Sequence, residues 1–178
     1  MSTLDAVPEI VALAGPPRPT TLDGLMEADG LVLVLVGLRY PGNVGFILRS
    51  AEVAGAAGVV VVSDWTGSQM EEALRVGMRP DRFMPVLESE AELAVSAARR
   101  VERRLMALET SGRRAPWESD LTRPTALFVG SETTGIPDAI LDSMHDIVRL
   151  PTDGFIPSYN VQAAVGMCLG EWIRQNAR

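Results

Sequence analysis

The sequence predicts an α/β fold, a single layered domain with a mostly parallel β-sheet. Short apolar runs rich in β-branched residues alternate along the chain with longer amphipathic segments, which is the pattern of strands joined by crossover helices. Two of the runs, LVLVLVG and GVVVV, are apolar almost without interruption. Such strands are typical of a parallel sheet that helices cover on both faces.

Length and composition fit one domain of this kind. The chain has 178 residues, of which 47% are hydrophobic and 22% charged, so it is long enough to bury a core without disulfides. We expect an N-terminal arm at residues 1–28, where proline is frequent and apolar periodicity is weak. The domain itself is expected at residues 29–178.

The order of the expected elements follows from these patterns. The expected strands are the apolar runs at residues 31–37, 58–63, 84–87, 105–108, 125–130 and 146–150. The expected helices are the amphipathic segments at residues 43–56, 68–76, 90–103, 137–144 and 158–175. In the ordinary interpretation of these two residues, Asn43 caps the first of these helices and Ser158 the last, because both side chains accept hydrogen bonds from free backbone N–H groups.

Composition excludes several kinds of site. Cys168 and His145 are the only cysteine and the only histidine, which excludes an internal disulfide and a zinc site built from cysteines or Cys/His pairs. No other grouping suggests a metal, and we expect none. The N-terminus is acidic where a signal peptide is basic, and no apolar run is long enough to span a bilayer. We therefore expect a cytoplasmic protein without a membrane partner.

The net charge of −7 argues against a protein that coats nucleic acid indiscriminately, because such binding depends on neutralising phosphates. The basic residues are all arginines, and several are clustered. One cluster is expected on a helix, either as a solvated face paired with Glu92 and Glu102 or as a contact for nucleic acid. It consists of Arg99, Arg100, Arg103 and Arg104.

Chemistry is expected in the loops that follow the strands, because ligands of open parallel sheets collect beyond the carboxyl ends of the strands. Three such loops concentrate Gly, Pro, Asn, Ser or acidic residues: GLRYPGNVGFILRS, VGSETTGIP and LPTDGFIPSYNVQ. In the first loop, Arg49 lies among mostly apolar or small residues. A buried cation needs a partner, so Arg49 either faces a ligand or pairs with Glu52.

The second and third loops each have a functional and an ordinary interpretation. Gly130 and Gly135 free the backbone around Glu132 for a ligand, or the loop is a turn whose Ser131 and Glu132 cap a short helix. In the third loop, Ser158 and Asn160 open the C-terminal helix. Hydrolase chemistry is weakly supported, because a serine nucleophile needs a base and His145 is expected at the opposite end of the sheet.

Taken together, the three loops resemble, in order, the three motifs of the SpoU (TrmH-type) ribose 2′-O-methyltransferases of the SPOUT superfamily. The resemblance covers roughly residues 31–174 and implies a trefoil knot in the C-terminal part of the α/β domain, a feature rare enough that sequence physics alone would not propose it. It implies a catalytic set with its members at the matching motif positions. These are Asn43, Arg49, Glu132, Ser158 and Asn160.

The resemblance also implies S-adenosylmethionine as the cofactor. The implied cofactor-binding residues lie at the ends of three expected strands and in the loops after them. They are Leu108, Thr110, Gly130, Gly135, Ile136, Leu150, Ser158 and Asn160. Three residues depart from the common motifs, and these changes are expected to affect substrate or cofactor fit more than the reaction type. They are Ser131, Thr152 and Tyr159.

The implied partners are RNA and a second copy of the chain. Family members are generally homodimers with the active site near the subunit interface, and the apolar face of the last helix is expected to serve the core, the interface or both. Arg49, Arg113 and Arg114 are the expected RNA contacts, the last two in a flexible loop. The chain is too short for the N-terminal substrate-binding domain of many members, which favours tRNA as the substrate.

Other functions remain open on the sequence alone. The enzyme could instead methylate ribosomal RNA, with antibiotic resistance as one consequence. The chain could also be a non-catalytic RNA- or cofactor-binding member of the fold, although the presence of the whole catalytic set argues against this. The least specific alternative is a small-ligand-binding α/β domain, which failure to bind S-adenosylmethionine would favour.

Overall fold

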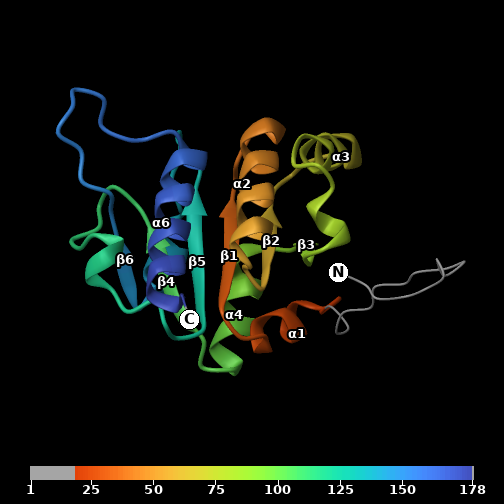
Figure 1. Cartoon of the computed structure of the whole chain (residues 1–178), viewed down its shortest axis with the longest axis horizontal. Helices are drawn as coiled ribbons and strands as arrows, with labels where there is room; N and C mark the ends of the chain where they lie inside the picture. The colour runs from red at the N-terminus through yellow and green to blue at the C-terminus, as the bar shows by residue number, and fades with distance from the viewer. Residues whose placement is uncertain (1–18, 178) are drawn as a thin grey trace, which may run out of the picture.

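The computed structural model describes residues 19–177 (Figure 1). Its centre is a six-stranded sheet with the order β3-β2-β1-β5-β4-β6, in which every pair of neighbouring strands is parallel. The strands are β1 (Leu31–Val36), β2 (Gly58–Val62), β3 (Val86–Glu88), β4 (Arg104–Leu108), β5 (Thr125–Gly130) and β6 (Asp146–Val148). The predicted α/β fold with a parallel sheet is thus confirmed.

Helices cover both faces of this sheet. They are α1 (Leu22–Glu27), α2 (Pro41–Ala54), α3 (Gly67–Val76), α4 (Ala91–Arg100), α5 (Asp138–Leu141) and α6 (Val161–Asn176), with short 3-10 turns at Pro80–Arg82 and Pro116–Glu118. In Figure 1, α2 and α6 lie side by side in front of the strands, and α4 lies behind them. None of the helices in the described part of the chain has both the length and the apolar character needed to cross a membrane.

The central strand β1 shows why its sequence has no polar alternation. Leu31, Leu33 and Leu35 point into one core with α2 and α6, while Val32 and Val34 point into a second core with α1 and α4. All of these side chains are at most 1% exposed. A strand between two helical layers needs apolar residues at every position, as the sequence predicted.

The N-terminal arm predicted at residues 1–28 falls largely on residues 1–18, which lie outside the described residues. The remainder contains α1, which packs on α4. Leu25 and Met26 of α1 are fully buried in the second core. The described part of the arm therefore packs as part of the domain.

Both predicted helix caps are wrong. Helix α2 begins at Pro41 after Tyr40, and a proline suits this first position because its missing N–H has no helical acceptor there. Asn43 is consequently inside the first turn. Helix α6 begins at Val161, and its cap is Asn160, whose Oδ1 accepts a hydrogen bond of 3.0 Å from the backbone N–H of Gln162. Ser158 is left free of a capping role.

The arginine cluster predicted on one helix is also corrected. Helix α4 ends at Arg100, and Arg103 lies beyond it with only 2% of its surface exposed. The Arg103 guanidinium donates to the carbonyl oxygens of Met26, Ala28, Gly30 and Thr125. Burial lowers the pKa of Arg103. Its acceptors are backbone carbonyl groups at the end of α1 and at the amino ends of β1 and β5. This arginine holds the fold together and is not available to RNA.

Two other members of the cluster form ion pairs, while Arg99 donates a hydrogen bond of 3.5 Å to the Ser143 carbonyl oxygen. Arg100 forms an ion pair with Asp23 of α1, and Arg104 lies 3.3 Å from the Asp146 carboxylate. Neither predicted partner, Glu92 or Glu102, forms an ion pair with them in the described structure. The trefoil knot expected in the C-terminal part of the chain stays a prediction.

Candidate functional site

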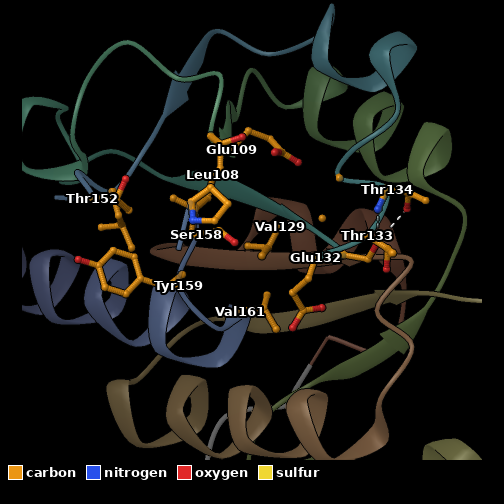
Figure 2. Close-up of a pocket in the computed structure, with 17 residues that line it drawn as sticks. Leu108, Glu109, Val129, Glu132, Thr133, Thr134, Thr152, Ser158, Tyr159 and Val161 are labelled. Atoms are coloured by element: carbon orange, nitrogen blue, oxygen red, sulfur yellow. Dashed lines mark hydrogen bonds between the residues drawn. The ribbon is translucent and has the colours of Figure 1, made fainter. Parts of the chain in front are cut away.

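A cavity of about 370 Å³ lies where β4, β5 and β6 end (Figure 2). Its walls come from residues 108–110, residues 129–135, the segment after β6 and the first turn of α6. Most of the predicted cofactor-binding residues line it: Leu108, Thr110, Gly130, Gly135, Leu150 and Ser158. The other two do not, since Ile136 is buried behind the wall and Asn160 caps α6. The second and third predicted loops therefore meet at one site.

The second loop folds back tightly over the end of β5. Gly135 donates a backbone hydrogen bond of 2.9 Å to Ser131, and the Ser131 hydroxyl lies 2.8 Å from that of Thr134. A Cβ atom at Gly130 would lie 2.4 Å from the carbonyl carbon of Gly135, and Gly135 has a φ of 64°. Both glycines are required by this geometry. Ser131 closes the turn and does not cap α5, which begins after Pro137.

Glu109 is a cavity residue that the sequence analysis missed. It follows the last residue of β4, and its Oε1 accepts a hydrogen bond of 2.7 Å from the backbone N–H of Ile136. The contact ties the end of β4 to the loop after β5. A carboxylate directly after an apolar strand was the available signal. Ser131, Thr152 and Tyr159, which were expected to affect substrate or cofactor fit, also line the cavity. The other lining residues that the sequence analysis did not name are Val129, Thr133, Thr134, Pro157, Val161 and Ala164.

Glu132 and Asn43 connect the cavity to α2. Glu132 lines the cavity, and its Oε1 accepts a hydrogen bond of 3.0 Å from the side-chain amide of Asn43. Asn43 reaches Glu132 because it projects from the first turn of α2. In Figure 2, Glu132 points toward this helix. The first and second predicted loops thus meet through their side chains.

Arg49 lies outside the cavity. It is exposed on α2 and has no ion pair or hydrogen bond within residues 19–177, so the predicted alternative of a salt bridge with Glu52 is not formed. The premise that its surroundings bury it was wrong, because the apolar neighbours Ile47 and Leu48 face the core on the other side of the helix. No group within residues 19–177 occupies its guanidinium, which can therefore contact another molecule.

The third loop contributes Ser158 and Tyr159 to the cavity wall. The Tyr159 hydroxyl donates a hydrogen bond of 3.2 Å to the Pro151 carbonyl oxygen, which joins the two ends of this loop. Residues 151–160 are all exposed, and Figure 1 shows this segment extending away from the sheet. The loop is therefore the most open wall of the site.

Arg113 and Arg114 are exposed, as an RNA contact requires, but their backbone is not a free loop. Arg114 forms a parallel bridge with Val148, and its carbonyl accepts a hydrogen bond of 2.8 Å from the Arg149 N–H. The Arg113 N–H donates to the Ile147 carbonyl oxygen. The expectation of a flexible loop is corrected to a segment that extends the sheet beside β6.

The structure offers no thiol or imidazole nucleophile at the cavity. Cys168 is buried in α6, and burial raises the pKa of its thiol to about 12. His145 precedes β6 at the opposite end of the sheet, as predicted, and its Nδ1 accepts a hydrogen bond of 2.9 Å from the Leu105 N–H. Over the described residues, no group of His, Cys, Asp and Glu side chains is placed to hold a metal ion.

Comparison with known proteins links this geometry to a family. Residues 30–170 match the family described as the SpoU rRNA Methylase family. The chain is 32% identical over 153 residues to the 23S rRNA (guanosine-2′-O-)-methyltransferase RlmB of Pseudomonas syringae pv. tomato, covering 85% of this chain and 61% of the relative. The chain therefore spans about three fifths of the length of such relatives.

Two solved structures share the fold along most of this chain. The AdoMet-bound rRNA methyltransferase from Sinorhizobium meliloti superposes with a TM-score of 0.82 at 26% identity, covering 90% of this chain and 62% of that one. The SpoU methyltransferase AviRb from Streptomyces viridochromogenes gives 0.78 at 26% identity, covering 89% and 64%. The resemblance carried by the three loops is confirmed, and the chain belongs to the SpoU rRNA Methylase family.

Proposed function

We propose that the chain is an RNA methyltransferase that transfers a methyl group from S-adenosylmethionine to a ribose 2′-hydroxyl. The observation that carries the proposal is the cavity at the ends of β4, β5 and β6, whose Glu132 is hydrogen-bonded to Asn43. The second and third motif loops build the wall of the cavity, and the first is attached to it through Asn43. The same residues were singled out by the resemblance to ribose methyltransferases.

The cavity suits S-adenosylmethionine in size and lining. Its volume lies within the range of about 300 to 1,000 Å³ that is usual for small-molecule sites. Leu108, Leu150 and Val161 supply apolar surface for a purine ring, while Glu109 and the threonines of the second loop supply polar groups for a sugar and an amino acid. When bound, this cofactor supplies a methyl group on a positively charged sulfur.

The chain's own residues would orient the acceptor and manage its proton. Arg49 would hold an RNA phosphate and stabilise negative charge on the ribose oxygen, because a guanidinium stays charged at neutral pH and is poorly suited to act as a base. Asn43 and Asn160 would orient the substrate, and Glu132 would hold Asn43. Ser158, exposed at the cavity wall, would relay the proton of the ribose 2′-hydroxyl to solvent as the methyl group is transferred.

We propose ribosomal RNA as the substrate. The tRNA expectation rested on chain length alone, whereas the relatives that resemble this chain are named for 23S rRNA, which supports the alternative. The solved structure concerned with tRNA methylation at C/U34 is 23% identical and bears on the fold alone. Action on ribosomes in the cytoplasm is part of this proposal.

A homodimer is also proposed. Arg49 is exposed and outside the cavity of its own chain, so a second subunit is needed if it is to take part in a closed site. Phe46 of α2 and Met167 of α6 are 49% and 44% exposed on neighbouring helices, which supports an apolar contact there.

The test is transfer of labelled methyl groups from S-adenosylmethionine to separated rRNA and tRNA, with cofactor binding measured in parallel. Label in rRNA that makes the modified position resistant to alkaline cleavage is expected. Label in tRNA alone would restore the earlier expectation. Binding of the cofactor without transfer to any RNA would favour the non-catalytic alternative, and absence of binding would exclude the methyltransferase.

A further inference from the structure

We infer that Glu109 binds the ribose hydroxyls of the cofactor's nucleoside and thereby selects a ribonucleoside ligand. This inference rests on the proposed function, because it names a contact within the same cavity. Glu109 belongs to none of the three motif loops. It lines the cavity, and its hydrogen bond with Ile136 holds it there.

The two oxygens of the Glu109 carboxylate have different surroundings. Oε1 accepts the 2.7 Å hydrogen bond from the Ile136 N–H. Oε2 has no hydrogen-bond partner among residues 19–177, although the side chain is half-buried and lines the cavity. One oxygen is thus anchored, and the other keeps its capacity to accept a hydrogen bond from a ligand.

The surrounding backbone is shaped around this carboxylate. A Cβ atom at Gly135 would lie 2.9 Å from Oε1 and 3.5 Å from Oε2, so a side chain at Gly135 would displace Glu109. If the only role of this side chain were to accept the Ile136 N–H, the amide oxygen of a glutamine at position 109 would serve equally well. A half-buried carboxylate is more costly to desolvate, which indicates that the second oxygen has a ligand of its own.

Position decides which part of the cofactor lies at Glu109. The reacting methyl group must lie near the members of the catalytic set that reach the cavity, which are Ser158 on its wall and Glu132 with its partner Asn43. Figure 2 shows Glu109 and Glu132 on different sides of the cavity. We place the nucleoside end of the cofactor at Glu109, because its vicinal hydroxyls are neutral hydrogen-bond donors that the free carboxylate oxygen can accept from.

The test combines two changes, removal of the Glu109 carboxylate and removal of the ligand hydroxyls, and measures the dissociation constant for each combination by calorimetry. The probes are S-adenosylhomocysteine and its 2′,3′-dideoxy analogue, each titrated into wild type, Glu109→Gln and Glu109→Ala. Glu118→Gln is the matched control, because the Glu118 carboxylate also accepts a backbone N–H, that of Ala115 at 2.7 Å, but lies outside the cavity lining.

Wild type is expected to bind the dideoxy analogue about 10- to 100-fold more weakly than S-adenosylhomocysteine, as loss of hydrogen bonds to a charged group implies. Glu109→Ala should bind both probes with nearly equal affinity, and Glu109→Gln should lose part of the discrimination while its melting temperature stays unchanged. If the Glu109 variants bound both probes more weakly by the same factor, the preference for the hydroxyls would not depend on Glu109. Glu109 would then be only a structural anchor, and the inference would be overturned. Failure of wild type to bind either probe would instead overturn the proposed function itself.

Discussion

The side-chain amide of Asn43 donates a 3.0 Å hydrogen bond to the carboxylate of Glu132, which joins the first turn of α2 to the loop after β5 across 89 residues of sequence. Replacing the amide with a carboxylate places two negative charges together. We expect Asn43→Asp to lower methyl transfer about tenfold or more, because the hydrogen bond becomes a repulsion. Labelled methyl transfer measures the effect.

The control for this pair is a double variant in which the donor and the acceptor of the hydrogen bond are exchanged. Combining Asn43→Asp with Glu132→Gln restores one donor and one acceptor with the roles exchanged, so the double variant should recover part of the lost activity. Wild-type activity in Asn43→Asp alone would show that the contact is irrelevant to the reaction.

Arg49→Ala is expected to reduce methyl transfer at least about 100-fold, since a guanidinium that stabilises developing charge contributes on this scale. Binding of S-adenosylhomocysteine and the melting temperature should not change, because Arg49 is exposed and has no partner within the described residues. Arg82→Ala, an exposed arginine of another segment, is the control. Turnover close to wild type in Arg49→Ala would remove this residue from the mechanism.

Arg103→Ala should lower the free energy of unfolding by about 2 to 4 kcal/mol, because it leaves several buried carbonyl groups without donors. Arg100→Ala removes only an exposed ion pair with Asp23 and should cost less than about 1 kcal/mol. Urea denaturation followed by circular dichroism measures both. Equal losses in the two variants would contradict the structural role of Arg103.

Cys168 should react with iodoacetamide at pH 8 only when the protein unfolds. Burial raises the pKa of its thiol to about 12 and also blocks access to the sulfur. Mass spectrometry after modification at increasing urea should therefore follow the unfolding curve, without interference from any other cysteine. Rapid modification of the native protein would mean that α6 opens locally.

The end of α6 should lose stability in acid. Hydrogen bonds from Arg174 and Gln175 lower the pKa of Glu171 to about 2 from an ordinary 4.5. Stability from this contact is complete above the ordinary value and disappears as pH falls toward 2. The melting temperature of wild type should exceed that of Glu171→Gln at pH 5, and the difference should shrink toward pH 2. A difference that does not vary with pH would exclude this ionisation as the cause.

Local patterns predicted the strands well, because a strand that is buried on both faces, such as β1, has an apolar residue at every position. They misplaced the helix starts, since Pro41 and Tyr40 compete with Asn43 as the beginning of α2 and only the path of the chain decides between them. The second and third loops were found through their glycines and polar residues. Glu109 was missed because its partner, Ile136, is distant in sequence. Arg103 was misassigned because its carbonyl acceptors come from separate segments that no local pattern connects.

One guanidinium, that of Arg103, bonds to backbone from the end of α1, the start of β1 and the start of β5. These three segments cannot separate one at a time without leaving the others with unsatisfied groups. The amino ends of the strands should therefore open in a single cooperative step and exchange their amide hydrogens late. The loops around the cavity, at the opposite ends of the same strands, are free to rearrange around ligands without weakening that unit.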